Sequence, residues 1–167
     1  VTGIFSDLGC DACGTGLQIL AENFILGSER NVLGVRFWGG YHPGDLSIDP
    51  DLFYVKIYAD DAGGAAPGTE LASYGPMAAT TKEATGVVLF GVAEYVYTID
   101  APTTLSAGTY WVTVYNDTAA VADSWFWEAG DNDPVAGILG QAWTPDSPTG
   151  PWNFDPATDM AFELICD

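Results

Sequence analysis

The stretch NVLGVRFW, residues 31–38, decides the fold class of this chain. Apolar side chains at positions 33, 35 and 37 alternate there with Gly34, Arg36 and Trp38. A two-residue period is typical of a strand with one buried face, because successive side chains point to opposite faces of a sheet. The stretch LFYVKIYA, residues 52–59, repeats this alternation. Both segments are predicted strands.

The pattern continues along the chain, with turn residues between the apolar runs. It predicts further strands at 19–26, 70–74, 86–90, 94–99, 109–115, 124–128 and 160–165, and weaker ones at 2–5 and 140–143. Gly and Pro mark connectors at 60–68, 101–102, 106–108 and 145–156, since Gly permits positive φ and Pro removes a hydrogen-bond donor. About nine to eleven short strands predict an all-β fold, a two-sheet antiparallel β-sandwich of jelly-roll type.

The length and the charge limit what such a domain can bind. We expect the 167 residues to form a single domain, with 1–16 as an N-terminal segment that carries a disulfide or serves as a donor strand. The 23 acidic residues face only four basic ones, a net charge of −19. Nucleic acid and anionic membranes are excluded as partners, because both are bound through Lys and Arg. No apolar run approaches the length of a membrane span, so membrane insertion is not expected.

Export is expected from the start of the sequence. It begins at Val1 without a charged n-region or an apolar h-region, as a secreted chain does once its signal peptide has been removed. Three cysteines, Cys10, Cys13 and Cys166, lie near the two ends. In an exported protein two pairings are open: Cys10 or Cys13 with Cys166, or Cys10 with Cys13, leaving Cys166 free or joined to another chain.

Uncompensated carboxylates make calcium the cofactor to consider, and no organic cofactor is expected. Calcium takes oxygen ligands clustered on loops. Clusters occur at 45–51, at 60–61 and at 131–133, and the last two are the preferred candidates, with Asp60, Asp61, Asp131, Asn132 and Asp133 as ligands. The alternative is that each cluster only stabilises its own turn, since Asp and Asn bond their own backbone.

Aromatic residues are the second conspicuous resource. Strand alternation places several on what should be an outer sheet face, where they could stack on a sugar or bury against a second subunit. The candidate surface consists of Trp38, Tyr54, Tyr58, Trp111, Tyr115, Trp125 and Trp127. Two alternatives remain open: a long loop such as 143–152 folds over these rings, or some of them belong to the core.

Nothing in the sequence points to catalysis. The only histidine, His42, lies in the turn-like segment GYHPG with no nucleophile motif around it. Carboxylate pairs are abundant, but no spacing singles one out. We therefore expect a protein that is not an enzyme.

Several segments together resemble exported bacterial β-sandwich domains that often occur in proteins with a PEP-CTERM sorting tail. They are AENF at 21–24, GVRFWG at 34–39, IYADDAGG at 57–64, AGTYWV at 107–112, WFWE at 125–128 and AFEL at 161–164. The resemblance implies export and a cell-surface or matrix role, and it brings no catalytic residues. The CDAC motif at 10–13 departs from the family pattern.

Two functions compete at this point. The first hypothesis is an extracellular structural protein of a surface, matrix or filamentous appendage, which assembles with copies of itself through strand edges and aromatic faces, assisted by calcium. The alternative is a secreted carbohydrate-binding module that uses aromatic platforms and acidic loops. Fold alone does not decide between them.

Overall fold

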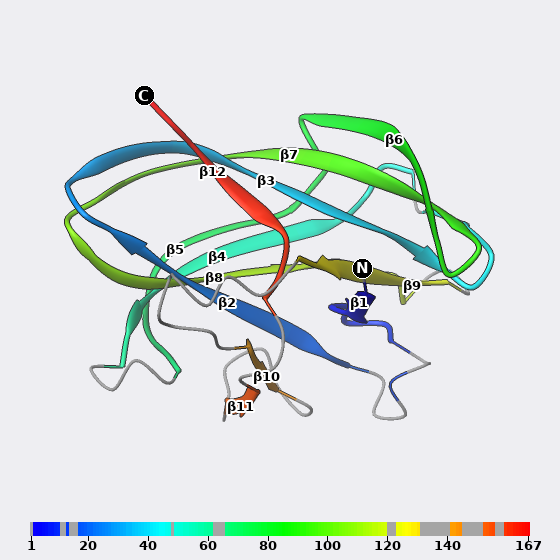
Figure 1. Ribbon diagram of the computed structural model, residues 1–167, viewed down its shortest axis with the longest axis horizontal. Coiled ribbons are helices and arrows are strands. Elements are labelled where there is room, and N and C mark those ends of the chain that lie inside the picture. The colour runs from blue at the N-terminus through cyan, green and yellow to red at the C-terminus, as the bar shows by residue number, and fades with distance from the viewer. Residues whose placement is uncertain are drawn as a thin grey trace.

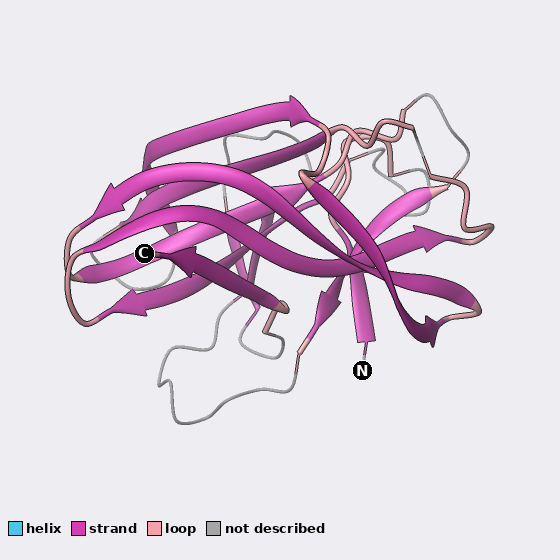
Figure 2. Ribbon diagram, turned by 90° about the horizontal axis from the view of Figure 1, so that it is seen from above, coloured by secondary structure: helices cyan, strands magenta, loops and turns pink. Residues whose placement is uncertain are grey.

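The computed structural model describes residues 2–10, 13, 17–47, 49–61, 66–119, 123–130, 141–144, 152–155 and 159–167. These residues form strands and connectors without an α-helix (Figure 2). The strands are β1 (Thr2–Phe5), β2 (Ile19–Leu26), β3 (Arg30–His42), β4 (Phe53–Asp60), β5 (Pro67–Met77), β6 (Thr81–Leu89), β7 (Val92–Leu105), β8 (Gly108–Tyr115), β9 (Ser124–Ala129), β10 (Gln141–Thr144), β11 (Asn153–Asp155) and β12 (Phe162–Cys166). The all-β prediction is confirmed.

The strands form two antiparallel sheets. The first has the order β1-β9-β3-β7-β6, and β12 joins it beside β3 (Figure 1). The second has the order β11-β10-β2-β8-β4-β5. The chain crosses between the sheets at every connection except β4 to β5, β6 to β7 and β10 to β11. The order β1-β9-β3-β7 facing β2-β8-β4-β5 is that of an eight-stranded jelly roll, so the predicted type of sandwich is confirmed.

Strand β3 is long enough to take two partners on one side. Its first half pairs with β12, from Val32 to Phe37, and its second half with β9, from Gly39 to His42. Its other side pairs with β7 over almost the whole length. The first and last parts of the chain thereby meet on one sheet.

The core lies between the two sheets and is rich in aromatic rings. Phe37 stacks on Tyr97 at 5.4 Å between ring centroids and meets Phe53 and Trp125 edge-on at 5.1 and 5.8 Å. These four rings are fully buried, together with aliphatic side chains from both sheets. Such rings contribute large buried areas and edge-to-face contacts, so they dominate the packing of this sandwich.

Most predicted strands match, and the mismatches have local causes. Strand β7 runs through the predicted connector 101–102, where the register with β3 shifts between Val32 and Gly34. Strand β11 lies inside the proline-containing stretch 145–156 that was predicted as loop. Strands β3, β5 and β6 are longer than predicted, because they continue through residues that break the strict alternation. No helix in the described ranges is long and apolar enough to cross a membrane.

Candidate functional site

Strand β1 forms one end of the first sheet. It pairs only with β9, from Thr2 opposite Ala129 to Phe5 opposite Phe126. The Ser6 amide continues this ladder by donating to the Trp125 carbonyl. Because hydrogen bonding alternates along antiparallel strands, the amides of Gly3 and Phe5 point away from β9. In the described part of the chain no strand lies on that side of β1.

The other sheet edges carry devices that discourage pairing with a further strand. Strands β5, β6 and β12 contain charged residues and irregular register, and β11 contains Asp155. Charges, prolines and bulges are the usual means of protecting an edge. β1 has none of these: its sequence is Thr-Gly-Ile-Phe and its register with β9 is continuous. Among the described edges it is the one best suited to accept a strand.

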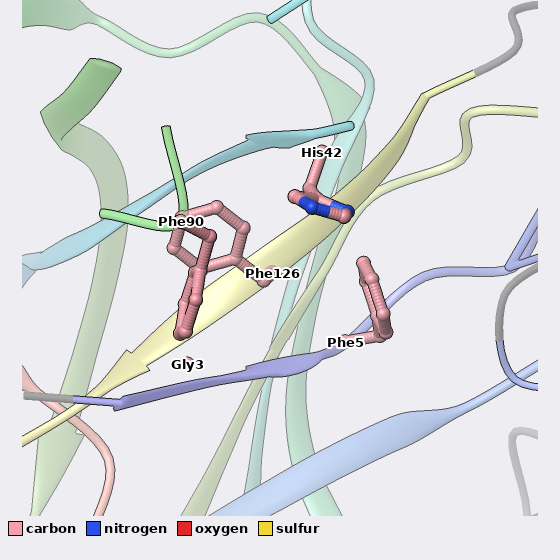
Figure 3. Close-up of a pocket in the computed structure, with 5 residues that line it drawn as sticks. All are labelled: Gly3, Phe5, His42, Phe90 and Phe126. Atoms are coloured by element: carbon pink, nitrogen blue, oxygen red, sulfur yellow. The ribbon is translucent and has the colours of Figure 1, made fainter. Parts of the chain in front are cut away.

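An aromatic cavity lies on the outer face of the same sheet, beside β1 (Figure 3). It has a volume of about 160 Å³ and is lined by Gly3, Phe5, His42, Phe90 and Phe126. The His42 ring lies 6.2 Å from Phe5 and 6.4 Å from Phe90, and Phe90 lies 5.6 Å from Phe126. Gly3 is required here, because a Cβ at this position would come within 2.5 Å of the Phe126 ring.

The tip of the β6–β7 hairpin extends this apolar surface into solvent. Phe90 is 55% exposed and Val87 45%, whereas Leu89 and Val92 pack against Phe126. We call this surface the apolar corner and define it as Phe5, His42, Val87, Phe90 and Phe126. Segments 2–5 and 86–93 contain no charged residue, although the chain carries a net charge of −19. A neutral apolar surface beside an unprotected edge is typical of a site of association.

Two glutamates lie near the corner on the outer face of the sheet. Burial raises the pKa of Glu128 to about 8, and a hydrogen bond and the negative charge of Glu94 add to the effect. Glu94 itself is buried. The pair therefore holds a proton at neutral pH, which lowers the negative charge next to β1.

Four of the predicted aromatic residues do lie together on one outer face, that of the second sheet. Tyr54 is opposite Tyr115 and Tyr58 is opposite Trp111, and the Tyr54 and Tyr115 rings stack at 4.8 Å. The predicted exposure is wrong for three of the four. Trp111, Tyr58 and Tyr115 are buried, and Trp152 packs edge-on against Tyr58 at 6.0 Å. Trp152, at the end of the segment named in the alternative, covers Tyr58.

The remaining three residues of the predicted aromatic surface lie in two different places. Trp125 and Trp127 point into the core, so the prediction that they belong to a surface is wrong: strand alternation sends Phe126 outward between them. Trp38 lies on the outer face of the first sheet, half-buried. It lines a shallow depression of about 310 Å³ with Arg36 and Glu83.

In the described residues, the acidic loops do not bring together side chains arranged to bind calcium. The Trp111 indole donates to Asp60 at 3.0 Å, and the Asp61 amide donates to the Ala66 carbonyl. Asp131, Asn132 and Asp133 lie outside the described residues. No group of three or more carboxylate, His or Cys side chains suited to a metal occurs in the described ranges. Calcium binding stays a prediction.

One of the two cysteine pairings is present. Cys10 and Cys13 form a disulfide with their Cα atoms 5.4 Å apart, and Cys166 is a free, exposed thiol on β12. Sequence reasoning missed the apolar corner, because Phe5, His42, Phe90 and Phe126 come from four separate segments. The available signal was the run VVLFGV at 87–92, which is too apolar for an exposed hairpin.

Comparison with protein-family models, curated proteins and solved structures finds no match to this chain.

Proposed function

We propose that this protein is a non-catalytic, secreted structural protein of a cell surface, matrix or filamentous appendage, and that it self-associates through β1 and the apolar corner. The observation that carries the proposal is the combination at one place of an unprotected strand edge and exposed apolar side chains. Pairing of β1 with a strand of a second copy satisfies the outward backbone groups of Gly3 and Phe5. It also removes Phe90 from water.

The geometry of association depends on which strand edge of the second copy pairs with β1. Pairing of β1 with β1 of a second copy is symmetric and closes as a dimer. Pairing with a different edge is head-to-tail and continues as a filament. The net charge of −19 opposes both, since copies repel each other at low ionic strength. Salt or calcium is expected to promote association by screening or bridging the carboxylates.

Sedimentation velocity over a concentration series tests the proposal. The wild-type protein is expected to form dimers or larger species as its concentration rises, and more so with added salt or calcium. Phe90→Asp should keep the protein monomeric, because a charge on the apolar corner must then be desolvated. Leu71→Asp is the matched control, since Leu71 is also exposed, at 47%, but lies on β5 of the other sheet. A monomeric wild type under all conditions, or equal loss in both variants, contradicts the proposal.

A further inference from the structure

A second cavity opens between the two sheets, where β5 passes to β6. It has a volume of about 450 Å³ and is lined by Ser47, Asp49, Pro50, Asp51, Ala78, Ala79, Lys82 and Tyr95. This volume lies in the range of small-molecule sites. The small side chains of Ala78 and Ala79, between the end of β5 and the start of β6, leave this space open.

Lys82 is held rigidly at the wall of this cavity. Its ammonium lies 3.3 Å from the Asp51 carboxylate and 4.9 to 5.5 Å from the ring centroids of Tyr41, Tyr95 and Tyr97. Cation–π contacts with three rings and an ion pair leave the side chain little freedom. The ammonium is therefore a preorganised donor beside the cavity.

Asp51 is held by a buried network behind it. The Tyr41 hydroxyl donates to Asp51, and the Asn116 amide donates to the Tyr41 oxygen at 2.8 Å. The loop that carries the cavity residues is anchored nearby, since Asp123 accepts the Gly44 and Leu46 amides at 3.0 and 2.6 Å. Donors and acceptors of the cavity are thus set before any ligand arrives.

The charges of the lining exclude two classes of ligand. Asp49, Asp51 and Lys82 leave the lining with a net charge of −1, which repels phosphates and other anions. A divalent metal is disfavoured because the Lys82 ammonium already occupies the position next to Asp51. Burial, followed by the charges of Asp45 and Asp51, raises the pKa of the Tyr95 hydroxyl, which therefore stays neutral.

We infer that this cavity binds a neutral sugar of hexose size, free or at the end of a polysaccharide. Sugar hydroxyls both donate and accept, so they pair with the carboxylates of Asp49 and Asp51 and with the ammonium of Lys82. The ring of Tyr95 lines the cavity beside these polar groups. The inference is independent of association through β1, since the two sites share no residue.

Titration of the labelled protein by amide NMR tests the inference, with glucose, galactose, mannose, xylose, maltose and cellobiose at about 10 mM as probes, tenfold above a Kd of about 1 mM. At least one neutral sugar is expected to shift the signals of the cavity residues. Asp49→Ala should weaken its binding about tenfold or more, through loss of a charged hydrogen bond. Lys82→Met should weaken it as well.

Glu83→Ala is the matched control. Glu83 is the neighbour of Lys82 on β6 but lines the depression beside Trp38 on the opposite face, so its loss should leave binding unchanged. Retention on starch or cellulose that the free sugar displaces would identify a chain end as the ligand, and binding without retention would identify a soluble sugar. Absence of any shift with all probes overturns the inference. Tighter binding of glucuronate than of every neutral sugar would also overturn the inference. The same holds if the NMR shifts are confined to residues of the Trp38 face.

Discussion

The carboxyl groups of Glu94 and Glu128 interact across β3, which lies between their strands β7 and β9. Two carboxylates in such contact cannot both be ionised at low cost, and burial adds to the effect. The pKa of Glu128 is accordingly raised to about 8. A second buried glutamate, Glu22, which accepts the Asn23 and Met160 amides, also has a pKa of about 8, chiefly through burial.

Stability should therefore fall as the pH rises from about 4.5 to about 8. Glu128 binds its proton more tightly in the folded state, so its contribution is complete below the unfolded pKa and is lost as the pH passes the folded value. Glu128→Gln should reduce the loss between pH 5 and pH 8.5 by about 1 kcal/mol, after allowance for partial exposure. Urea unfolding at pH 5 and at pH 8.5 measures this loss of stability. The exposed Glu83→Gln serves as the control for general charge, and an equal change in both variants would refute the assignment.

Asp7 should be the most sensitive carboxylate for folding. It is buried and accepts the Gly9, Thr118 and Trp125 amides and the Thr118 hydroxyl at 2.6 to 3.1 Å. Asp7→Ala leaves several buried donors unsatisfied and should cost about 3 kcal/mol or more in the free energy of unfolding. Asp117→Ala, which removes a longer hydrogen bond to an exposed amide, should cost below about 1 kcal/mol. Equal costs in denaturant titrations would disprove the role of Asp7.

Trp125 is expected to be a core residue in energetic terms. Trp125→Ala removes a fully buried ring that contacts Phe37, Phe53 and Tyr97, and should cost about 3 to 5 kcal/mol. Trp38→Ala, at a half-buried position on an outer face, should cost about 1 kcal/mol. The comparison uses the midpoint and slope of urea unfolding. A smaller loss of stability in Trp125→Ala than in Trp38→Ala would contradict the placement of Trp125 in the core.

The thiol chemistry should distinguish the three cysteines. In the native, unreduced protein one thiol per chain is expected to react with a disulfide reagent, because Cys166 is exposed and Cys10 is joined to Cys13. Cys166→Ser should abolish the reaction. Persistent labelling of that variant would show that the Cys10–Cys13 bond is absent in solution.

Local alternation was sufficient to predict the strands but not their surroundings. The period of two in 31–38 and 52–59 placed Phe37, Phe53 and Val55 inside correctly, but it placed Leu33 on the same face as Phe37, and Leu33 is 47% exposed. Of the seven aromatic residues predicted on a surface, only Tyr54, Tyr58, Trp111 and Tyr115 share one outer face. Whether such a face is open to solvent depends on distant segments. Trp152 covers Tyr58, and the alternation of side chains around either residue does not predict this contact.

The sites depend even more on topology. Lys82, Asp51 and Tyr95 come from β6, the loop before β4, and β7, and only the crossing of the chain between sheets brings them together. A lone lysine among acidic residues gave no spacing signal. β1 was predicted as a strand and as a candidate donor, but its position at the end of the first sheet required the pairing with β9.

Hydrogen exchange of the β1 amides tests the central claim most directly. The amides of Gly3 and Phe5 point away from β9, so they should exchange rapidly in dilute, monomeric protein. In concentrated protein, with salt or calcium added, both amides are expected to become strongly protected, while those of β5 and β12 keep their rates. Unchanged exchange at Gly3 and Phe5 in a demonstrably associated sample would contradict assembly through this edge.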